Sequence, residues 1–290
     1  MVLRGRQRAR RYSPTAKTGR SIMTVEPIKN IADRIRKRPA MYVGGTDQRG
    51  MLQLILEVVA NSIDQFLAGK ATCVRVEANE TTASVTDDGE GMPFDQAVPG
   101  SPDNLATSYL SAVHHSASAD GHAPHVHFGG LNGIGFVVSN SLSAEFRCRS
   151  CRDGYLWEQS FVRGVALGSA RKTGFVDGRG TIITFRPDPE IFGETKICIE
   201  SLRANAFEAV HLFPGLRFEI NHQVFYAPNG LGSLVHIHNN RDDVQGYRWQ
   251  DRPAFVVNEV FEDVQISAAA IGFTDTKTEW KTWSNGVQTS

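Results

Sequence analysis

The sequence has few cysteines and no long apolar run. Four cysteines in 290 residues are too few for a disulfide-stabilised scaffold, so a reducing, cytoplasmic compartment is expected. No run of about 18 apolar residues occurs, which argues against a transmembrane helix and against a membrane partner. Hydrophobic residues make up 41% and charged residues 21%, so a wholly disordered or fibrous chain is excluded.

Positive charge is concentrated at the N-terminus, although the formal net charge is zero. Residues 1–23 contain seven Lys or Arg residues and no acid, which leaves a mildly acidic remainder. The remainder therefore gives no sign of a DNA-binding surface of its own. We interpret residues 1–27 as a disordered basic extension. A nucleic-acid arm, an organelle transit peptide and a start at Met23 are the alternatives.

Hydrophobic periodicity predicts a mixture of helices and strands. Apolar residues at helical spacing predict helices over residues 28–38, 51–68, 104–115, 134–142 and 199–210. Alternation predicts strands at 73–78, 82–87, 144–150, 154–162 and 180–187, a hairpin at 216–227, and more strands after a glycine-rich break at 228–232. This order predicts an α+β fold, a two-layer sandwich of helices on a mixed, mostly antiparallel sheet.

A polar stripe interrupts the otherwise apolar helix predicted over residues 51–68. Glu57, Asn61 and Asp64 lie at positions i, i+4 and i+7, which places them on one narrow face. A buried carboxylate is costly without a partner, so this face is a candidate wall of a polar pocket. The alternative is an edge stripe that faces water.

Two glycine-rich turns are candidate ligand sites. The run Asp87-Asp88-Gly89-Glu90-Gly91 follows a predicted strand, and such a turn can be purely structural or can bring backbone close to a ligand. The run 129–135, GGLNGIG, opens a predicted helix, where glycine amides and the helix N-terminus favour phosphate. It matches neither the common dinucleotide pattern nor the common nucleoside-triphosphate loop.

Together, four runs resemble one family. RKRPAMYVGG (36–45), EVVANSID (57–64), DDGEGMP (87–93) and GGLNGIG (129–135) occur in the order and spacing of the ATPase region of type IIA topoisomerase B subunits, those of DNA gyrase and topoisomerase IV. The wider GHKL superfamily also includes mismatch-repair ATPases, a heat-shock chaperone and histidine kinases. The resemblance implies a GHKL ATP-binding domain at 28–230 and the start of a transducer domain at 231–290.

The resemblance implies roles for particular residues. Glu57 would be the general base that activates water, and Asn61 would hold Mg²⁺ between the phosphates of ATP. Asp87 would accept the adenine amino group, with Gly91 nearby on a bridging water. The remaining residues expected to bind nucleotide are Asp64, Gly130, Gly133, Gly135, Arg152, Thr181 and, from the partner in a dimer, Tyr42.

The same resemblance implies a larger machine. ATP binding would dimerise two copies and close a gate around DNA, together with a topoisomerase A-type subunit. The alternative is a truncated paralogue that binds ATP with little or no turnover, because the sequence lacks the transducer lysine that reaches the γ-phosphate. In either case the isolated chain is expected to be a weak ATPase.

Some positions depart from the family pattern. Glu90 stands where the family usually has Arg, and Gln65 where it usually has an acid, so a customary salt bridge is expected to be missing. Ala60 replaces a usual Asp, and Ala119 stands where a lid lysine is expected. The lid instead contains five histidines, which could supply partial positive charge near pH 6.5.

Other motifs have a structural interpretation. The histidines lack a recognised metal-binding spacing, so a polar lid is favoured over a metal site. Cys148 and Cys151 form a single C-x-x-C on a predicted strand, where the two side chains face opposite sides, so a zinc or redox pair is disfavoured. The four tryptophans are interpreted as packing residues.

Overall fold

The structure is a computed structural model that describes residues 30–112, 133–239, 255–261, 264–270, 281–284 and 287–288. The basic extension, Gly130, Ala119 and the five lid histidines lie outside the described residues. The predictions that concern them therefore stay predictions.

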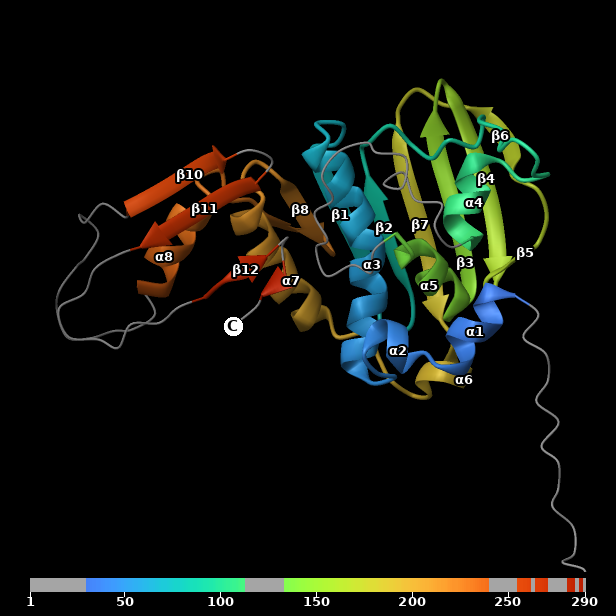
Figure 1. Cartoon of the computed structure of the whole chain (residues 1–290), viewed down its shortest axis with the longest axis horizontal. Coiled ribbons are helices and arrows are strands. Elements are labelled where there is room, and N and C mark those ends of the chain that lie inside the picture. Colours follow the sequence, from blue (N-terminus) through green and yellow to red (C-terminus); the bar gives the residue numbers. More distant parts are fainter. Residues whose placement is uncertain are drawn as a thin grey trace, which may run out of the picture.

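A nine-stranded sheet is the largest sheet among the described residues (Figure 1). Its order is β5-β4-β3-β7-β2-β1-β8-β9, with β6 paired to β4. Among the pairs in this sheet only β1 and β8 run parallel, which confirms the mostly antiparallel expectation. The strands are β1 (Cys73–Ala78), β2 (Ala83–Asp87), β3 (Ser143–Arg152), β4 (Tyr155–Val162), β5 (Val165–Ala166), β6 (Arg171–Phe175), β7 (Gly180–Pro187), β8 (Arg217–Ile220) and β9 (Gln223–Phe225).

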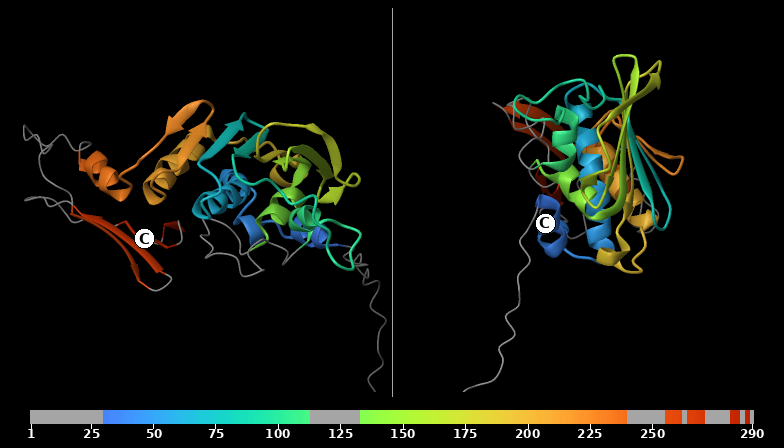
Figure 2. Two further views of the ribbon diagram at one scale, coloured as in Figure 1. Left: turned by 90° about the horizontal axis from the view of Figure 1, so that it is seen from above. Right: turned by 90° about the vertical axis from the view of Figure 1, so that its right-hand side faces the viewer.

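Helices form a second layer against this sheet, as the views in Figure 2 show. α3 packs against β1 and β2, and α5 packs against β3 and β4. Alternate residues of the strands face away from the helices and form exposed ion pairs, such as Arg186 with Glu145. The helices before β8 are α1 (Ile31–Lys37), α2 (Ala40–Val43), α3 (Gln48–Leu67), α4 (Leu105–Ser111), α5 (Gly135–Ser141), α6 (Pro189–Phe192) and α7 (Ile199–Leu212).

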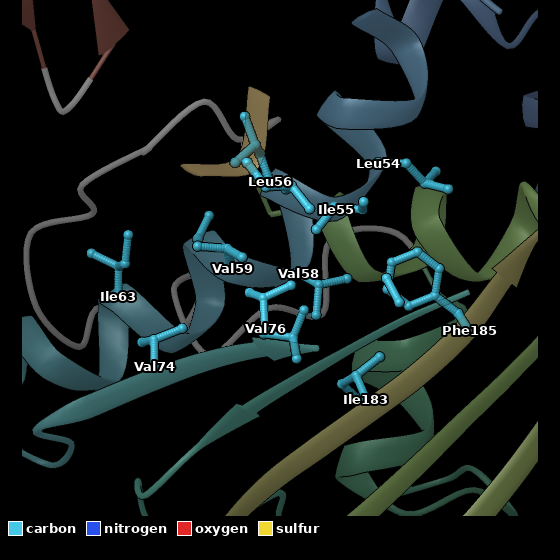
Figure 3. Packing of buried hydrophobic residues seen from close by; sticks show 14 of the residues in the cluster. Leu54, Ile55, Leu56, Val58, Val59, Ile63, Val74, Val76, Ile183 and Phe185 are labelled. Carbon is cyan, nitrogen blue, oxygen red and sulfur yellow. The ribbon is translucent and has the colours of Figure 1, made fainter. Parts of the chain in front are cut away.

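The core lies between α3 and the sheet (Figure 3). Leu54, Ile55, Val59 and Ile63 of α3 are fully buried, and they are joined by apolar side chains of β1 and β7. Burying one such side chain contributes about 1.5–3 kcal/mol. This packing fixes the orientation of α3, and with it the direction of the polar stripe that α3 carries.

The ends of α3 follow from local capping. The Asp47 carboxylate accepts from the amides of Arg49 and Gly50 at 3.1 and 3.2 Å, so the helix begins at Gln48, ahead of the predicted Met51. It ends at Leu67, and Gly69 follows with a φ of 69°, the left-handed conformation expected of a glycine after a helix.

The C-terminal part departs from the predicted pattern. α8 (Leu231–Asn239) begins where only a glycine-rich break and strands are expected. β10 (Phe255–Phe261) and β11 (Val264–Ala270) form an antiparallel hairpin within the region of expected strands, followed by the short pair β12 (Trp283–Ser284) and β13 (Val287–Gln288). The boundary at residue 230 stays a prediction. Within the described residues, no helix combines the length and apolar character needed to cross a membrane.

Candidate functional site

The polar stripe of α3 is built around a buried carboxylate. Glu57 is only 1% exposed, and its neighbours on the helix are mostly apolar. Gln53, one turn earlier on α3, donates from Nε2 to Glu57 Oε1 at 2.7 Å. Gln53 was not predicted from the sequence, but its i−4 relation to Glu57 is the signal that could have found it. The carboxylate is therefore oriented by its own helix.

The first residue of α5, Gly135, lies close to the same carboxylate. A Cβ built on Gly135 would lie 2.6 Å from Glu57 Oε2 and 3.3 Å from the Glu57 carbonyl oxygen, so any larger residue would displace the buried Glu57 side chain. Gly135, the last residue of the predicted glycine-rich turn, thus contacts the predicted general base. Gly133, two residues earlier, has a φ of 68°, which also favours glycine.

Asn61 is suited to hold a metal ion through one atom. Its Nδ2 donates to the Glu57 carbonyl at 2.7 Å, so Oδ1 is the atom of this amide that can coordinate a cation. Among the described residues, no group of three or more His, Cys, Asp or Glu side chains could hold a metal by itself. A magnesium ion commonly takes one or two protein oxygens and completes its shell with phosphates and water, and Asn61 fits that arrangement.

Asp64 completes the stripe in a partly buried position. Burial raises the pKa of its carboxyl from 3.8 to about 7. Near neutral pH the side chain is therefore divided between its charged and neutral forms. A raised pKa from burial is one feature of functional sites, and the place of Asp64 in a nucleotide pocket stays a prediction.

Asp87, at the end of β2, is held by three donors. Its Oδ1 accepts from the amides of Gly89 and Thr181 at 3.0 and 3.3 Å, and its Oδ2 accepts from the Ser62 hydroxyl at 2.9 Å. Burial raises the pKa of Asp87, and these three hydrogen bonds oppose that rise. A carboxylate offers about four lone-pair positions, so one remains for a further donor.

The contacts of Asp87 join three elements into one site. Ser62 belongs to α3, Gly89 to the turn after β2, and Thr181 to β7, where it lies opposite Asp87 in the sheet register. Thr181 thus contributes its backbone amide, and Ser62 is a site residue that the sequence analysis missed. Because Ser62 follows Asn61 directly, α3 connects the predicted base to the predicted adenine acceptor.

The turn after Asp87 needs glycine for two reasons. Gly91 has a φ of 78°, and a Cβ there would lie 2.6 Å from the Cys151 carbonyl and 2.7 Å from Ser150 Oγ. The requirement for glycine therefore comes from the protein's own packing against β3. The Gly91 carbonyl accepts from Arg152 Nη1 at 3.2 Å, which places Arg152 at this turn.

The customary salt bridge is replaced by a different one. Glu90 and Gln65 cannot pair as opposite charges, but the Glu90 amide donates to Gln65 Oε1 at 3.3 Å, and Lys70 Nζ lies 2.5 Å from Glu90 Oε1. Lys70, with Arg152 and Arg179 nearby, lowers the pKa of Glu90. Lys70 is therefore a further residue of this region that the sequence analysis missed.

The remaining candidates lie at the edge of the site or away from it. Tyr42 is on α2, partly buried against the core, and its predicted contact with a partner's nucleotide stays a prediction. Cys148 is buried and Cys151 is partly exposed, and both lie on β3. Trp157 stacks on Phe94 with ring centroids 6.1 Å apart, a packing role as predicted.

Comparisons with known proteins place the chain among known ATPases. Residues 46–191 match a family described as histidine kinase-, DNA gyrase B-, and HSP90-like ATPase. Similar proteins include the DNA gyrase B subunit of Clostridium acetobutylicum, 32% identical over 219 residues, and the DNA topoisomerase 4 B subunit of Bacillus subtilis, 34% identical over 220 residues. Each alignment covers 73% of this chain, and 34% and 33% of the respective relatives. The chain thus spans about a third of their length.

A solved structure is also similar. The 43K ATPase domain of Thermus thermophilus gyrase B, in complex with an aminocoumarin, matches with a TM-score of 0.69 and 28% sequence identity. The match covers 81% of this chain and 61% of that one. The similarity to the gyrase B ATPase domain therefore includes the arrangement of the helices on the sheet as well as the sequence.

Proposed function

Because the chain belongs to the histidine kinase-, DNA gyrase B- and HSP90-like ATPase family, we propose that it binds ATP with Mg²⁺ and hydrolyses it as the ATPase region of a type IIA topoisomerase B subunit. The buried Asp87 carboxylate carries this proposal. Three donors fix its orientation and leave one acceptor position, which suits a single amino group such as that of adenine.

The opposite end of the α3 stripe would bind the triphosphate. Asn61 Oδ1 would hold Mg²⁺, which supplies charge neutralisation for the phosphates when bound. The amides of Gly133 and Gly135, together with Gly130, would contact phosphate oxygens, because glycines at a helix start leave the backbone accessible to anions. Asp64, Thr181 and Arg152 would line the remaining wall of the pocket.

Glu57 would act as the general base. Its carboxylate would accept a proton from a water molecule while that water forms a bond to the γ-phosphorus, and the bond from phosphorus to the bridging oxygen of ADP breaks. Phosphoryl transfer depends mainly on positioning and on charge stabilisation. The support from this chain is the orientation of Glu57 by Gln53 and its closeness to the α5 turn.

The larger cycle would couple nucleotide to movement of DNA. ATP binding would dimerise two copies, with Tyr42 contacting the partner's nucleotide, and an A-type subunit would complete the enzyme that passes one DNA segment through another. The relatives named above are B subunits of such enzymes, and their similarity supports this role.

We also propose that the 290-residue chain alone turns over ATP slowly. Ala119 stands where the family places a lid lysine near the phosphates. The loss of one cationic contact lowers transition-state stabilisation. A chain that binds ATP with little or no turnover is the second candidate, favoured by the same missing lysine.

Titration calorimetry with ATP, with and without Mg²⁺, tests the proposal. Asp87→Asn should weaken binding about 10- to 100-fold, because hydrogen bonds to a charged group contribute about 1.5–3 kcal/mol. Asp103→Asn, at an exposed position away from the turn, is the matched control and should bind as the parent does. Equal affinity of Asp87→Asn and the parent would remove Asp87 from the site.

A further inference from the structure

The turn of residues 87–91 is held from several sides. Asp87 is fixed by α3 and β7, as described above. The Asp88 carboxylate accepts from the amides of Thr72 and Cys73 at 2.7 and 2.9 Å, which ties the turn to the start of β1. Arg152 donates to the Gly91 carbonyl. Glu90 is the remaining residue of the turn with a side chain, and its anchor is Lys70.

Lys70 reaches the turn from just beyond the end of α3. Its amide donates to the Gln65 carbonyl at 2.8 Å, so its backbone is fixed by the same residue whose side chain accepts from the Glu90 amide. Its Nζ lies 2.5 Å from Glu90 Oε1. Gln65 and Lys70 therefore hold Glu90 by its backbone and by its side chain respectively.

The ion pair between Lys70 and Glu90 lies on the solvent-exposed side of the turn. Both side chains are 46% exposed, so the pair adds little to overall stability. Its position matters more, because Glu90 lies between Asp87, the proposed adenine acceptor, and Gly91. We therefore expect a shift of Glu90 to act on Gly91 directly and on Asp87 through the backbone of residues 88 and 89.

We propose that Lys70 is a positioning residue for adenine recognition, which it supports by holding Glu90 and thereby the turn that carries Asp87 and Gly91. This inference rests on the proposed function of that turn. Gln65 and Glu90 do not carry opposite charges and cannot form an ion pair with each other. In this chain the ion pair that anchors Glu90 is the one with Lys70.

A double-mutant cycle tests the inference by calorimetry. Lys70→Met and Glu90→Gln should each weaken ATP binding about two- to fivefold, the range of a half-exposed ion pair. The double variant should be no weaker than either single variant, because one interaction is lost in all three. ADP should be affected by the same factor as ATP, since the turn is proposed to contact the base.

Two further variants separate positioning from general effects. Lys70→Arg keeps the charge and should restore parental affinity. Lys196→Glu breaks an exposed pair with Glu80, 2.8 Å long and on a different loop, and should leave affinity unchanged. Parental affinity in Lys70→Met, or full additivity in the double variant, would overturn the role of Lys70 alone. Absence of ATP binding by the parent would overturn the proposed function as well.

Discussion

Gln53 donates a hydrogen bond to Glu57 across one turn of α3, from Nε2 to Oε1 over 2.7 Å. The other carboxylate oxygen of Glu57 faces the first residue of α5, where a methyl group in place of the glycine hydrogen would collide with it. One oxygen is thus oriented by a side chain and the other is confined by backbone. The two constraints together fix the direction in which Glu57 can accept a proton.

The role of Glu57 can be separated from binding. Glu57→Gln keeps the size of the side chain and removes its basicity. We expect ATP affinity close to that of the parent and a fall in turnover of about 10²- to 10⁴-fold, the usual contribution of a general base. Calorimetry and a phosphate-release assay measure the two effects. A variant as active as the parent would refute the assignment of the base.

The role of Gln53 follows from its amide donor. Gln53→Met keeps the length of the side chain but cannot donate to Glu57. Turnover should fall about tenfold while ATP affinity is retained, since the base loses orientation and not its charge. Gln53→Asn, with the amide one methylene shorter, should recover less than full activity. If Gln53→Met hydrolyses ATP at the parental rate, the hydrogen bond has no catalytic consequence.

The close contact at Gly135 predicts an unusual response to alanine. In an open helical position, replacing glycine by alanine stabilises a protein by about 1 kcal/mol. In Gly135→Ala the new methyl group would meet Glu57, so we expect lower stability in urea unfolding and a loss of turnover of at least about tenfold.

Gly174→Ala is the matched control for this substitution. No atom lies within 4 Å of a Cβ built at Gly174, and its backbone is not in the left-handed region. Its stability and turnover should stay near those of the parent. Parental behaviour in Gly135→Ala as well would show that α5 and Glu57 are not in contact.

The raised pKa of Asp64 predicts a pH dependence of stability. The folded state keeps this proton up to a pH of about 7, whereas the unfolded chain releases it near 3.8. Stabilisation from the neutral carboxyl is therefore complete below about pH 3.8 and is lost as pH rises to about 7.

Asp64→Asn isolates this contribution. The variant should lose the decline between about pH 4 and 7 and be more stable than the parent by about 1–2 kcal/mol at pH 8, a discounted value because the site is partly solvated. Urea unfolding at a series of pH values measures the difference. A constant difference between parent and variant across this range would contradict the raised pKa.

Much of the fold follows from periodicity and capping. The helix predicted over 51–68 is observed at Gln48–Leu67, and the strand predicted at 73–78 is observed with the same bounds. The short α2 and α6 were not predicted, because four residues are too few to show a helical period. α8 was missed because Gly230 and Gly232 near its start are typical of a break between elements.

The site was predictable where it depends on one helix and less so where it depends on the fold. Glu57, Asn61 and Asp64 share a face because of helical spacing alone. Ser62 and Lys70 were not predicted, because their partners Asp87 and Glu90 lie 25 and 20 residues away along the chain. Such contacts exist only after β2 has packed beside α3.

The single parallel pair of the main sheet has a mechanical consequence. Asp87, Val74 and Phe218 lie opposite one another on β2, β1 and β8, and β8 follows α7 in the chain. Hydrogen bonds between paired strands thus connect β2, which ends at Asp87, to β8 through β1 alone. The chain continues from β8 toward the C-terminal hairpin of β10 and β11. Moving β2 relative to β8 would require breaking the backbone hydrogen bonds that join them through β1. We therefore expect β2 and β8 to move together as one rigid unit.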